Sequence, residues 1–504
     1  MTEKKIIEKY KTKADDIEAD ILITGGVGNI RKYEVAVPRF TQATSALIDD
    51  VRDDLITEVQ ITSKEILDPK VIDDLKKKFK AKAEIILTKK ISTISQQTKN
   101  IIIGHLIRKM LGLGDIEFIL GDSWIEEIVI NTSGEPLRIY HKKYGWLETN
   151  LFVTDENQIQ NYANIIARRV GRQITTLNPL LDAQLVTGDR ANAILYPIST
   201  KGNTITIRKF ARDPWTVTDF IKNKTASSYI MALIWIATQY ELNVLISGGT
   251  ASGKTSFLNI CMPFIPPNQR IVSIEDTREL QLPSFLYWCP MVTRLPNPEG
   301  KGEIRMLDLL VNSLRMRPDR IVLGEIRRKI DAEVLFEAMH TGHAIFGTVH
   351  ANSIQETLQR LINPPIEVAE NLLQAVDLNA VMFRDRRTGV RKLSQLGEFI
   401  GNEEAGKSHI TANLLFRYKP TTDSFIQHNV PIKLYEELSR HTGLSQSEIE
   451  KDIKDKEMIL NWLVKHDTRD VESVGKVMKE YYVDSNVVIK TASKNENPEK
   501  IIKL

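Results

Sequence analysis

The spacing of apolar positions along the chain changes near residue 99 and again near residue 221. The segment "IIIGHLIRKMLGLG" has the spacing of an amphipathic helix that stops at Gly112 and Gly114. Short runs of strand length follow in "IEEIVIN", "PLRIYHKKYGWLE" and "TITIRKF", with a helical pattern in "ENQIQNYANIIARRVG" between them. These patterns predict an α+β domain over residues 99–210.

Beyond residue 217, apolar runs of strand length alternate with segments of helix length. This alternation predicts an α/β domain with a parallel, doubly wound sheet over residues 218–504. The polar end of the chain, "NVVIKTASKNENPEKIIKL", is expected to be loose. A linker carrying Pro214 is predicted at residues 211–217, where a hinge would lie. Residues 1–98 are rich in Lys, Asp, Glu and Ile and predict a small mixed α/β region that is partly mobile.

Composition narrows the class of protein without identifying it. A length of 504 residues predicts two or three domains, and 42% hydrophobic and 26% charged residues are ordinary for a globular protein. The formal net charge of +3 does not favour a nucleic-acid binder. The charged start lacks an apolar signal region, and no apolar run approaches the ~18 residues of a membrane span. Cys261 and Cys289 predict neither a disulfide framework nor a four-cysteine zinc site. We therefore expect a cytoplasmic protein.

The segment "NVLISGGTASGKTSFLN", Asn243–Asn259, has the pattern of a phosphate-binding loop. In this pattern glycines let backbone N–H groups surround a β-phosphate, Lys254 reaches the β and γ oxygens, and the Thr255 hydroxyl ligates Mg²⁺. A predicted strand, "VLIS", precedes the loop and a predicted helix, "TSFLNICM", follows it, as the pattern requires. The alternative is a glycine-rich strand-to-helix turn without a ligand. The predicted nucleotide-binding residues are Gly248, Gly249, Thr250, Ala251, Ser252, Gly253, Lys254, Thr255 and Ser256.

Two further apolar strands end in acids, as phosphoryl transfer requires. "RIVLGE" ends in Glu325, with Gly324 in the place of the usual aspartate of a Walker B strand, and "RIVSIEDTREL" carries Glu275. Glu325 either holds Mg²⁺ through water or polarises the attacking water, and the residues leave both roles open. The alternative for Glu275 is that it caps a helix or lies on the surface without a role in the site. His350, after the apolar run "AIFGTV", is a candidate contact to the γ-phosphate, with a purely structural role as the alternative.

The order of "GGTASGKT", "IEDTREL", "SLRMRPDRIVLGEIR" and "HTGHAIFGTVHANS" resembles the Walker A, Asp box, Walker B and His box of the secretion ATPase superfamily. The resemblance covers roughly Lys99 to Tyr482. It implies a RecA-like ATPase domain after a PAS-like domain, with ATP and Mg²⁺ as ligands. The longer "IRRKIDAEVLFEAM" after the Walker B glutamate and the missing four-cysteine module resemble the archaeal branch.

The resemblance also implies roles for particular residues. Lys254, Thr255, Glu275, Glu325 and His350 match nucleotide-site positions of the family. Arginines of its N-terminal domain clamp the nucleotide as subunits close, and Arg190 in "GDRANAI" and Arg208 in "TIRKF" match best. The alternative for each arginine is a surface salt bridge of modest strength.

The function implied by the resemblance is a hexameric motor that hydrolyses ATP. It would power assembly of an archaeal type IV pilus-like filament, which could be a pilus, an archaellum or a type II-like secretion apparatus. Force would pass to a polytopic membrane platform protein, with the motor cytoplasmic and peripheral at the inner face of the membrane and no nucleic acid bound. One alternative is a conjugation-type nucleic-acid translocase. Another is a nucleotide-gated scaffold that does not turn ATP over.

Overall fold

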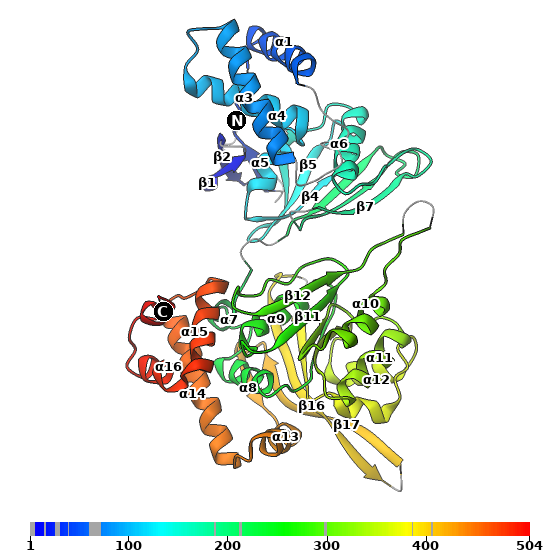
Figure 1. Cartoon of the computed structure of the whole chain (residues 1–504), viewed down its shortest axis with the longest axis vertical. Coiled ribbons are helices and arrows are strands. Elements are labelled where there is room, and N and C mark those ends of the chain that lie inside the picture. The colour runs from blue at the N-terminus through cyan, green and yellow to red at the C-terminus, as the bar shows by residue number, and fades with distance from the viewer. Residues whose placement is uncertain are drawn as a thin grey trace. The chain divides into compact units, whose positions relative to one another are not determined.

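The computed structural model describes residues 6–14, 17–25, 31–38, 40–59, 72–185, 188–210, 214–296, 300–385, 387–404 and 407–503. The chain divides into two compact units, Met1–Arg212 and Asp213–Leu504, and each has a sheet of its own (Figure 1). Ala211, Arg212 and Asp213, the first part of the predicted hinge, lie outside the described residues, as do residues 1–5 of the predicted mobile start. Val217, the last residue of that hinge, already begins helix α7.

The first unit is built on one sheet in the order β1-β2-β3-β6-β5-β4-β9-β8-β7. Neighbouring strands are antiparallel, except that β3 and β6 run parallel. Its strands are β1 (Ile6–Ala14), β2 (Ile17–Thr24), β3 (Lys32–Val35), β4 (Ile125–Ile130), β5 (Pro136–His141), β6 (Gly145–Phe152), β7 (Leu180–Gln184), β8 (Arg190–Ile194) and β9 (Thr204–Arg208). Its helices are α1 (Gln42–Glu58), α3 (Ile72–Lys90), α4 (Gln96–Leu111), α5 (Ile116–Gly121) and α6 (Glu156–Arg169).

The amphipathic patterns read from the sequence form the expected elements in this unit. In α6, Ile159, Ala163 and Ile166 recur at helical spacing and are buried, and the Asp155 side chain caps the helix by accepting from the Gln158 N–H at 2.9 Å. The cap and the apolar stripe explain why the helix begins where it does and which face it buries against the sheet.

The predicted division between residues 98 and 99 differs from the observed fold. It falls inside α4, and the strands before it belong to the same sheet as those after it, because Tyr33 of β3 pairs with Thr149 of β6. Ile21 and Tyr33 are fully buried in the same core as Ile128. The early strands therefore complete the sheet of the first unit, because their apolar faces have no other core of their own.

The second unit has a sheet in the order β12-β11-β13-β14-β10-β15-β16-β17-β18. The strands from β12 to β15 are parallel, and β16, β17 and β18 extend the sheet with antiparallel pairs. The strands are β10 (Val244–Gly248), β11 (Arg270–Glu275), β12 (Tyr287–Val292), β13 (Arg320–Leu323), β14 (Ala344–Val349), β15 (Leu378–Arg384), β16 (Arg391–Glu404), β17 (Lys407–Lys419) and β18 (Ser424–Gln427).

Helices cover both faces of this parallel sheet (Figure 1). Along β10, Val244 and Ile246 belong to one core and Leu245 to another, which is why the strand reads as a continuous apolar run. The helices are α7 (Val217–Lys222), α8 (Ser228–Gln239), α9 (Lys254–Cys261), α10 (Met306–Ser313), α11 (Lys329–His340), α12 (Ile354–Ile362), α13 (Lys433–Thr442), α14 (Gln446–Lys465), α15 (Val471–Val483), α16 (Ser485–Ser493) and α17 (Glu499–Ile502), with short 3-10 turns η3 (Met262–Phe264), η4 (Leu314–Met316) and η5 (Glu370–Ala375).

The polar end of the chain is helical, so the expectation of a loose tail was wrong. Val488 of α16 is fully buried, and Ala492 and Ile501 lie in the same core as the α8 helix. The Trp462 indole N–H donates to the Glu496 carbonyl at 2.7 Å. A few well-spaced apolar residues thus dock a segment whose average composition is polar.

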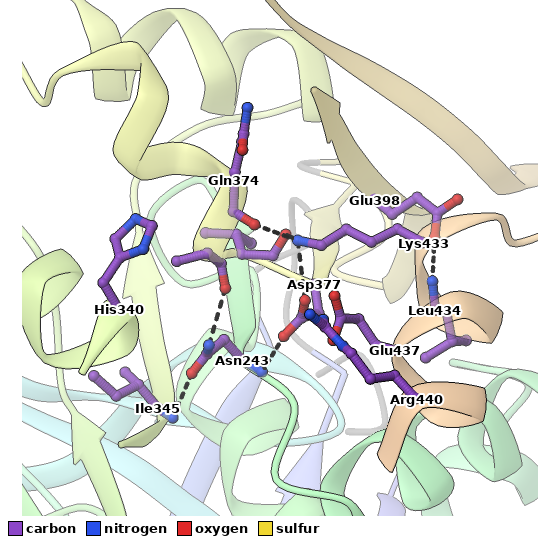
Figure 2. A network of polar contacts seen from close by, with 12 residues as sticks. Asn243, His340, Ile345, Gln374, Asp377, Glu398, Lys433, Leu434, Glu437 and Arg440 are labelled. Carbon is purple, nitrogen blue, oxygen red and sulfur yellow. Dashed lines mark hydrogen bonds and ion pairs between the residues drawn. The ribbon is translucent and has the colours of Figure 1, made fainter. Parts of the chain in front are cut away.

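A polar network fixes α13 at the end of the parallel sheet where β10, β14 and β15 begin (Figure 2). The Asn243 N–H donates to the Asp377 carboxylate at 2.8 Å, and the Asn243 side-chain oxygen accepts from the Ile345 N–H at 2.9 Å. The Lys433 ammonium contacts the Asp377 carboxylate at 2.9 Å and the Val376 carbonyl at 2.7 Å. The opposite ends of these strands are therefore left for the candidate site.

Candidate active site

The predicted phosphate-binding loop connects β10 to α9, as its sequence context required. A Cβ placed on Gly248 would lie 2.4 Å from the Ser252 hydroxyl and 2.6 Å from the Met382 carbonyl, so only glycine fits there. Gly253 has φ +97°, a left-handed conformation that favours glycine, and it directly precedes α9. The loop therefore turns tightly and presents the first N–H groups of α9 at the carboxyl end of the sheet, which is a geometry suited to an anion.

Lys254 folds back over this loop. Its ammonium donates to the carbonyls of Gly248 at 2.9 Å and Gly249 at 3.3 Å, and it lies 3.8 Å from the Glu325 carboxylate. Burial lowers the pKa of Lys254, and the nearby Glu325 opposes this shift. The ammonium is thus held by weak neutral acceptors and one carboxylate, and phosphate oxygens would be stronger partners for it.

Glu325 reaches the loop from a strand that is not the direct neighbour of β10. The strand β14 lies between β10 and β13, and Glu325 follows β13 after Gly324. The Gly324 N–H donates to the Ile274 carbonyl at 2.8 Å, which continues the pairing of β13 with β11 beyond the strand end. The two predicted acid-bearing strands are therefore adjacent, and Glu325 is the acid that lies beside Lys254.

An arginine that sequence reasoning missed connects the two strand ends. The Arg327 guanidinium donates to Glu325 at 2.7 Å and to the Asp276 carboxylate at 2.9 Å. Its position four residues after β13, within "LGEIRR", gave no separate signal, because arginine is common in exposed loops. Arg327 holds one oxygen of Glu325, while the other oxygen is the one nearest Lys254.

Glu275 is buried and bound to its own loop. One oxygen accepts the backbone N–H groups of Glu279 at 2.8 Å and Leu280 at 3.1 Å, and the other is buried without a hydrogen-bond partner in the described part of the chain. Burial raises the pKa of Glu275 to about 7, against the lowering effect of the two N–H groups. The group is only 3% exposed and would exchange a proton near neutral pH.

The end of β14 brings a third loop to the site. Val349 pairs with Ser247, so the half-buried His350 follows β14 beside the point where β10 enters the loop. Two residues later, the Asn352 side-chain oxygen would lie 3.0 Å from a Cβ on Gly249. The Asn352 N–H donates to Glu356 at 2.9 Å, which fixes this residue over the loop. Asn352 stands in the quoted "VHANS" segment, but its residue type alone did not single it out.

The predicted arginines lie in the first unit, whereas the loop and acids lie in the second. Arg190 and Arg208 are directly opposite each other on β8 and β9. Arg190 makes a two-pronged ion pair with Asp182, at 3.0 and 2.6 Å, and half of its side chain is exposed. Because this pair is two-pronged, it holds Arg190 more firmly than a single surface ion pair would.

The donors available for a magnesium ion are few. Among the described residues there is no cluster of three or more His, Cys, Asp or Glu side chains that could hold a metal by itself. Thr255 is half-buried in the first turn of α9, and the carboxylate of Glu325, which follows β13, lies 3.8 Å from the Lys254 ammonium at the start of that helix. This set fits Mg²⁺, which commonly takes one or two protein oxygens, waters and the phosphates of a bound nucleotide.

The loop, the acids at neighbouring strand ends and the parallel sheet together define an α/β protein with a candidate phosphate-binding site. The profile of the family described as "Type II/IV secretion system protein" matches residues 128–388. The chain belongs to this family, which confirms the resemblance read from the four motifs. Within the described ranges, no helix has the length and apolar character needed to cross a membrane.

Individual relatives and solved structures are similar to parts of this chain. An uncharacterised protein of Methanocaldococcus jannaschii is 33% identical over 385 residues, which cover 75% of this chain and 69% of the relative. A putative conjugal transfer protein of Mycobacterium tuberculosis is 34% identical over 227 residues, covering 43% of this chain and 63% of the relative. The X-ray structure of the Legionella pneumophila ATPase DotB is 16% identical with a TM-score of 0.40, covering 75% of this chain and 90% of DotB.

Proposed function

We propose that the chain is a motor ATPase that binds Mg·ATP at the β10–α9 loop and hydrolyses it. The observation that carries this proposal is the convergence of Lys254, Glu325 and the start of α9 at one end of the parallel sheet. The strand order, with β14 between the loop strand and the acid strand, supports a RecA-like architecture. The arrangement suits phosphoryl transfer, where the protein positions groups and stabilises charge.

In this mechanism Lys254 leaves the Gly248 and Gly249 carbonyls and binds the β- and γ-phosphate oxygens. Glu325 then accepts a hydrogen bond from the attacking water, while Arg327 keeps the carboxylate aimed at it. A bound Mg²⁺, held by Thr255 and through water by Glu325, would neutralise phosphate charge. Glu275 stabilises the loop after β11 through its two backbone contacts. His350 and Asn352 line the γ-phosphate side from the end of β14.

We further propose that the motor acts as a homohexamer. Its first unit would be a PAS-like domain that supplies Arg190 and Arg208 to the nucleotide as the units close. A pair of arginines on neighbouring strands is suited to such a clamp. The motor would be cytoplasmic and peripheral, and it would drive assembly of an archaeal pilus-like filament through a membrane platform protein.

A conjugation-type nucleic-acid translocase is the second candidate, because a relative is named as a putative conjugal transfer protein. The two candidates differ in their response to DNA. A translocase requires ATP hydrolysis that double-stranded DNA stimulates and that rising salt suppresses. The filament motor is expected to hydrolyse ATP at the same rate with and without DNA, and its net charge of +3 agrees with that expectation.

The test is phosphate release by the full chain and by Lys254→Ala and Glu325→Gln. Both variants are expected to fold and to hydrolyse ATP at least about tenfold more slowly, because each removes a charge-bearing contact of the transition state. Glu333→Gln, an exposed acid on α11, is the matched control and should keep the full rate. A full rate in either site variant would remove the role assigned to that residue.

A further inference from the structure

The end of β15 and the start of β16 lie against the predicted phosphate-binding loop. Gly248 pairs with Met382 of β15, and the Arg391 Nε–H at the start of β16 donates to the Ala251 carbonyl at 3.1 Å. A Cβ on Gly253 would contact Arg391 Cδ at 3.4 Å and Met382 Cε at 3.6 Å. The stem of Arg391 therefore passes over the loop directly before α9.

The strands β15 and β16 are on the side of β10 opposite Glu325. In the sheet, β10 has β14 and then β13 on one side and β15 on the other. Lys254 contacts Glu325 on the β13 side, so the γ-phosphate end of a bound nucleotide belongs there. A triphosphate that crosses the start of α9 from that side directs its nucleoside towards β15 and β16, where Arg391 lies.

The chemistry of Arg391 suits a nucleoside. A guanidinium is planar, is always charged and stacks on aromatic rings, and a nucleobase is such a ring. Arg384 is the direct cross-strand partner of Arg391, so a second guanidinium stands on the same face of the strand pair.

We propose that Arg391 forms a nucleobase subsite, in which its guanidinium stacks on the base of the nucleoside triphosphate. This inference rests on the proposed nucleotide binding and adds the element that recognises the nucleoside rather than the phosphates. The contact with Ala251 holds the guanidinium at the loop before the ligand arrives, which lowers the entropic cost of binding.

A purely structural role for Arg391 makes a different prediction. If Arg391 only supports the loop through Ala251, its removal weakens binding of any polyphosphate, with or without a base. If it stacks on the base, its removal weakens binding of ATP and leaves inorganic tripolyphosphate unaffected. Stacking of one base on a protein side chain is worth about 1–3 kcal/mol in comparable sites, so a loss of about tenfold in affinity is expected.

The experiment is calorimetric titration of the full chain with Mg·ATP and with magnesium tripolyphosphate. Arg391→Ala and Arg391→Lys are expected to bind ATP about tenfold more weakly and tripolyphosphate within about twofold of the wild type. The lysine variant is expected to lose ATP affinity because lysine keeps the positive charge but lacks the planar group that stacks on the base. If the variants bind tripolyphosphate as tightly as the wild type does, their phosphate-binding loop is correctly folded.

Phe383→Ala is the matched control. Phe383 stands next to Met382 on β15 with its side chain on the alternate face, and it is 48% exposed. Its ATP affinity should match the wild type. If Arg391→Ala loses affinity equally for ATP and tripolyphosphate, or keeps its affinity for ATP, the nucleobase subsite is overturned. The proposed function would still stand in either case. A wild-type chain that binds tripolyphosphate but not ATP would overturn both.

Discussion

Replacing Glu275 by glutamine is expected to change how the stability of the chain depends on pH. Glu275 is 3% exposed, and burial raises the pKa of its carboxyl from 4.5 to about 7. Between these two values the folded chain holds a proton that the unfolded chain has released. The contribution of Glu275 to the free energy of unfolding therefore falls as pH rises from about 4.5 to about 7 and then levels off.

The size of the effect follows from the same pKa values. One pKa unit corresponds to about 1.4 kcal/mol, so Glu275 costs the folded chain about 3 kcal/mol when it is fully ionised. Between pH 5 and pH 8.5, the free energy of unfolding of Glu275→Gln relative to the wild type should rise by roughly 2 to 3 kcal/mol. The new amide hydrogens carry a cost of their own, but that cost is the same at both pH values and cancels in the comparison.

The assay is urea unfolding followed by circular dichroism at pH 5 and pH 8.5 for the wild type, Glu275→Gln and Glu333→Gln. The exposed Glu333 has no comparable burial, so its variant should follow the wild type at both pH values. A difference between Glu275→Gln and the wild type that stays constant within about 0.5 kcal/mol across this range would refute the reasoning.

Three further substitutions test other parts of the structure. Gly248→Ala places a Cβ 2.6 Å from a backbone carbonyl and should abolish ATP hydrolysis, as measured by phosphate release. Arg327→Gln frees Glu325 and should lower kcat several-fold with little change in KM, whereas Arg328→Gln, the next residue, should keep kcat within twofold. Glu398→Gln weakens the bonds from the Ile432 and Leu434 N–H groups and should lower thermal stability by about 1–3 kcal/mol without changing kcat; a change in kcat would contradict the assignment of this network to structure.

The second unit was largely predictable because its signals are local. The strand β14 coincides with the run "AIFGTV", since a strand covered on both faces is apolar at nearly every position. The strand-turn-helix geometry of the predicted phosphate-binding loop was predictable because glycines at fixed spacing allow one tight backbone turn. The position of Glu325 at the end of a strand was predictable because it directly follows a short apolar run and one glycine.

Features that depend on contacts between distant segments were not predictable. The pairing of Tyr33 with Thr149 joins strands more than a hundred residues apart, and no local pattern reports it. The same holds for the contact between Arg391 and Ala251, because these residues are 140 positions apart in the sequence. The helical tail was missed because its mean composition hides the few apolar positions, such as Val488, that dock it.

The arginines were predictable only in part. Arg190 and Arg208 were selected by resemblance, and their opposition across β8 and β9 became visible only from the register of the sheet. Arg327 was not selected, although it makes the closest charged contacts to Glu325. A single sequence does not separate such an arginine from its neighbour Arg328, because both are exposed charges in one loop.

The most direct test of the central claim is the structure of the full chain with Mg²⁺ and a non-hydrolysable ATP analogue. We predict that the Lys254 ammonium moves from the Gly248 and Gly249 carbonyls to the β- and γ-phosphate oxygens, with Glu325 on the γ-phosphate side. A triphosphate bound elsewhere, with Lys254 still folded onto the loop carbonyls, would contradict the account.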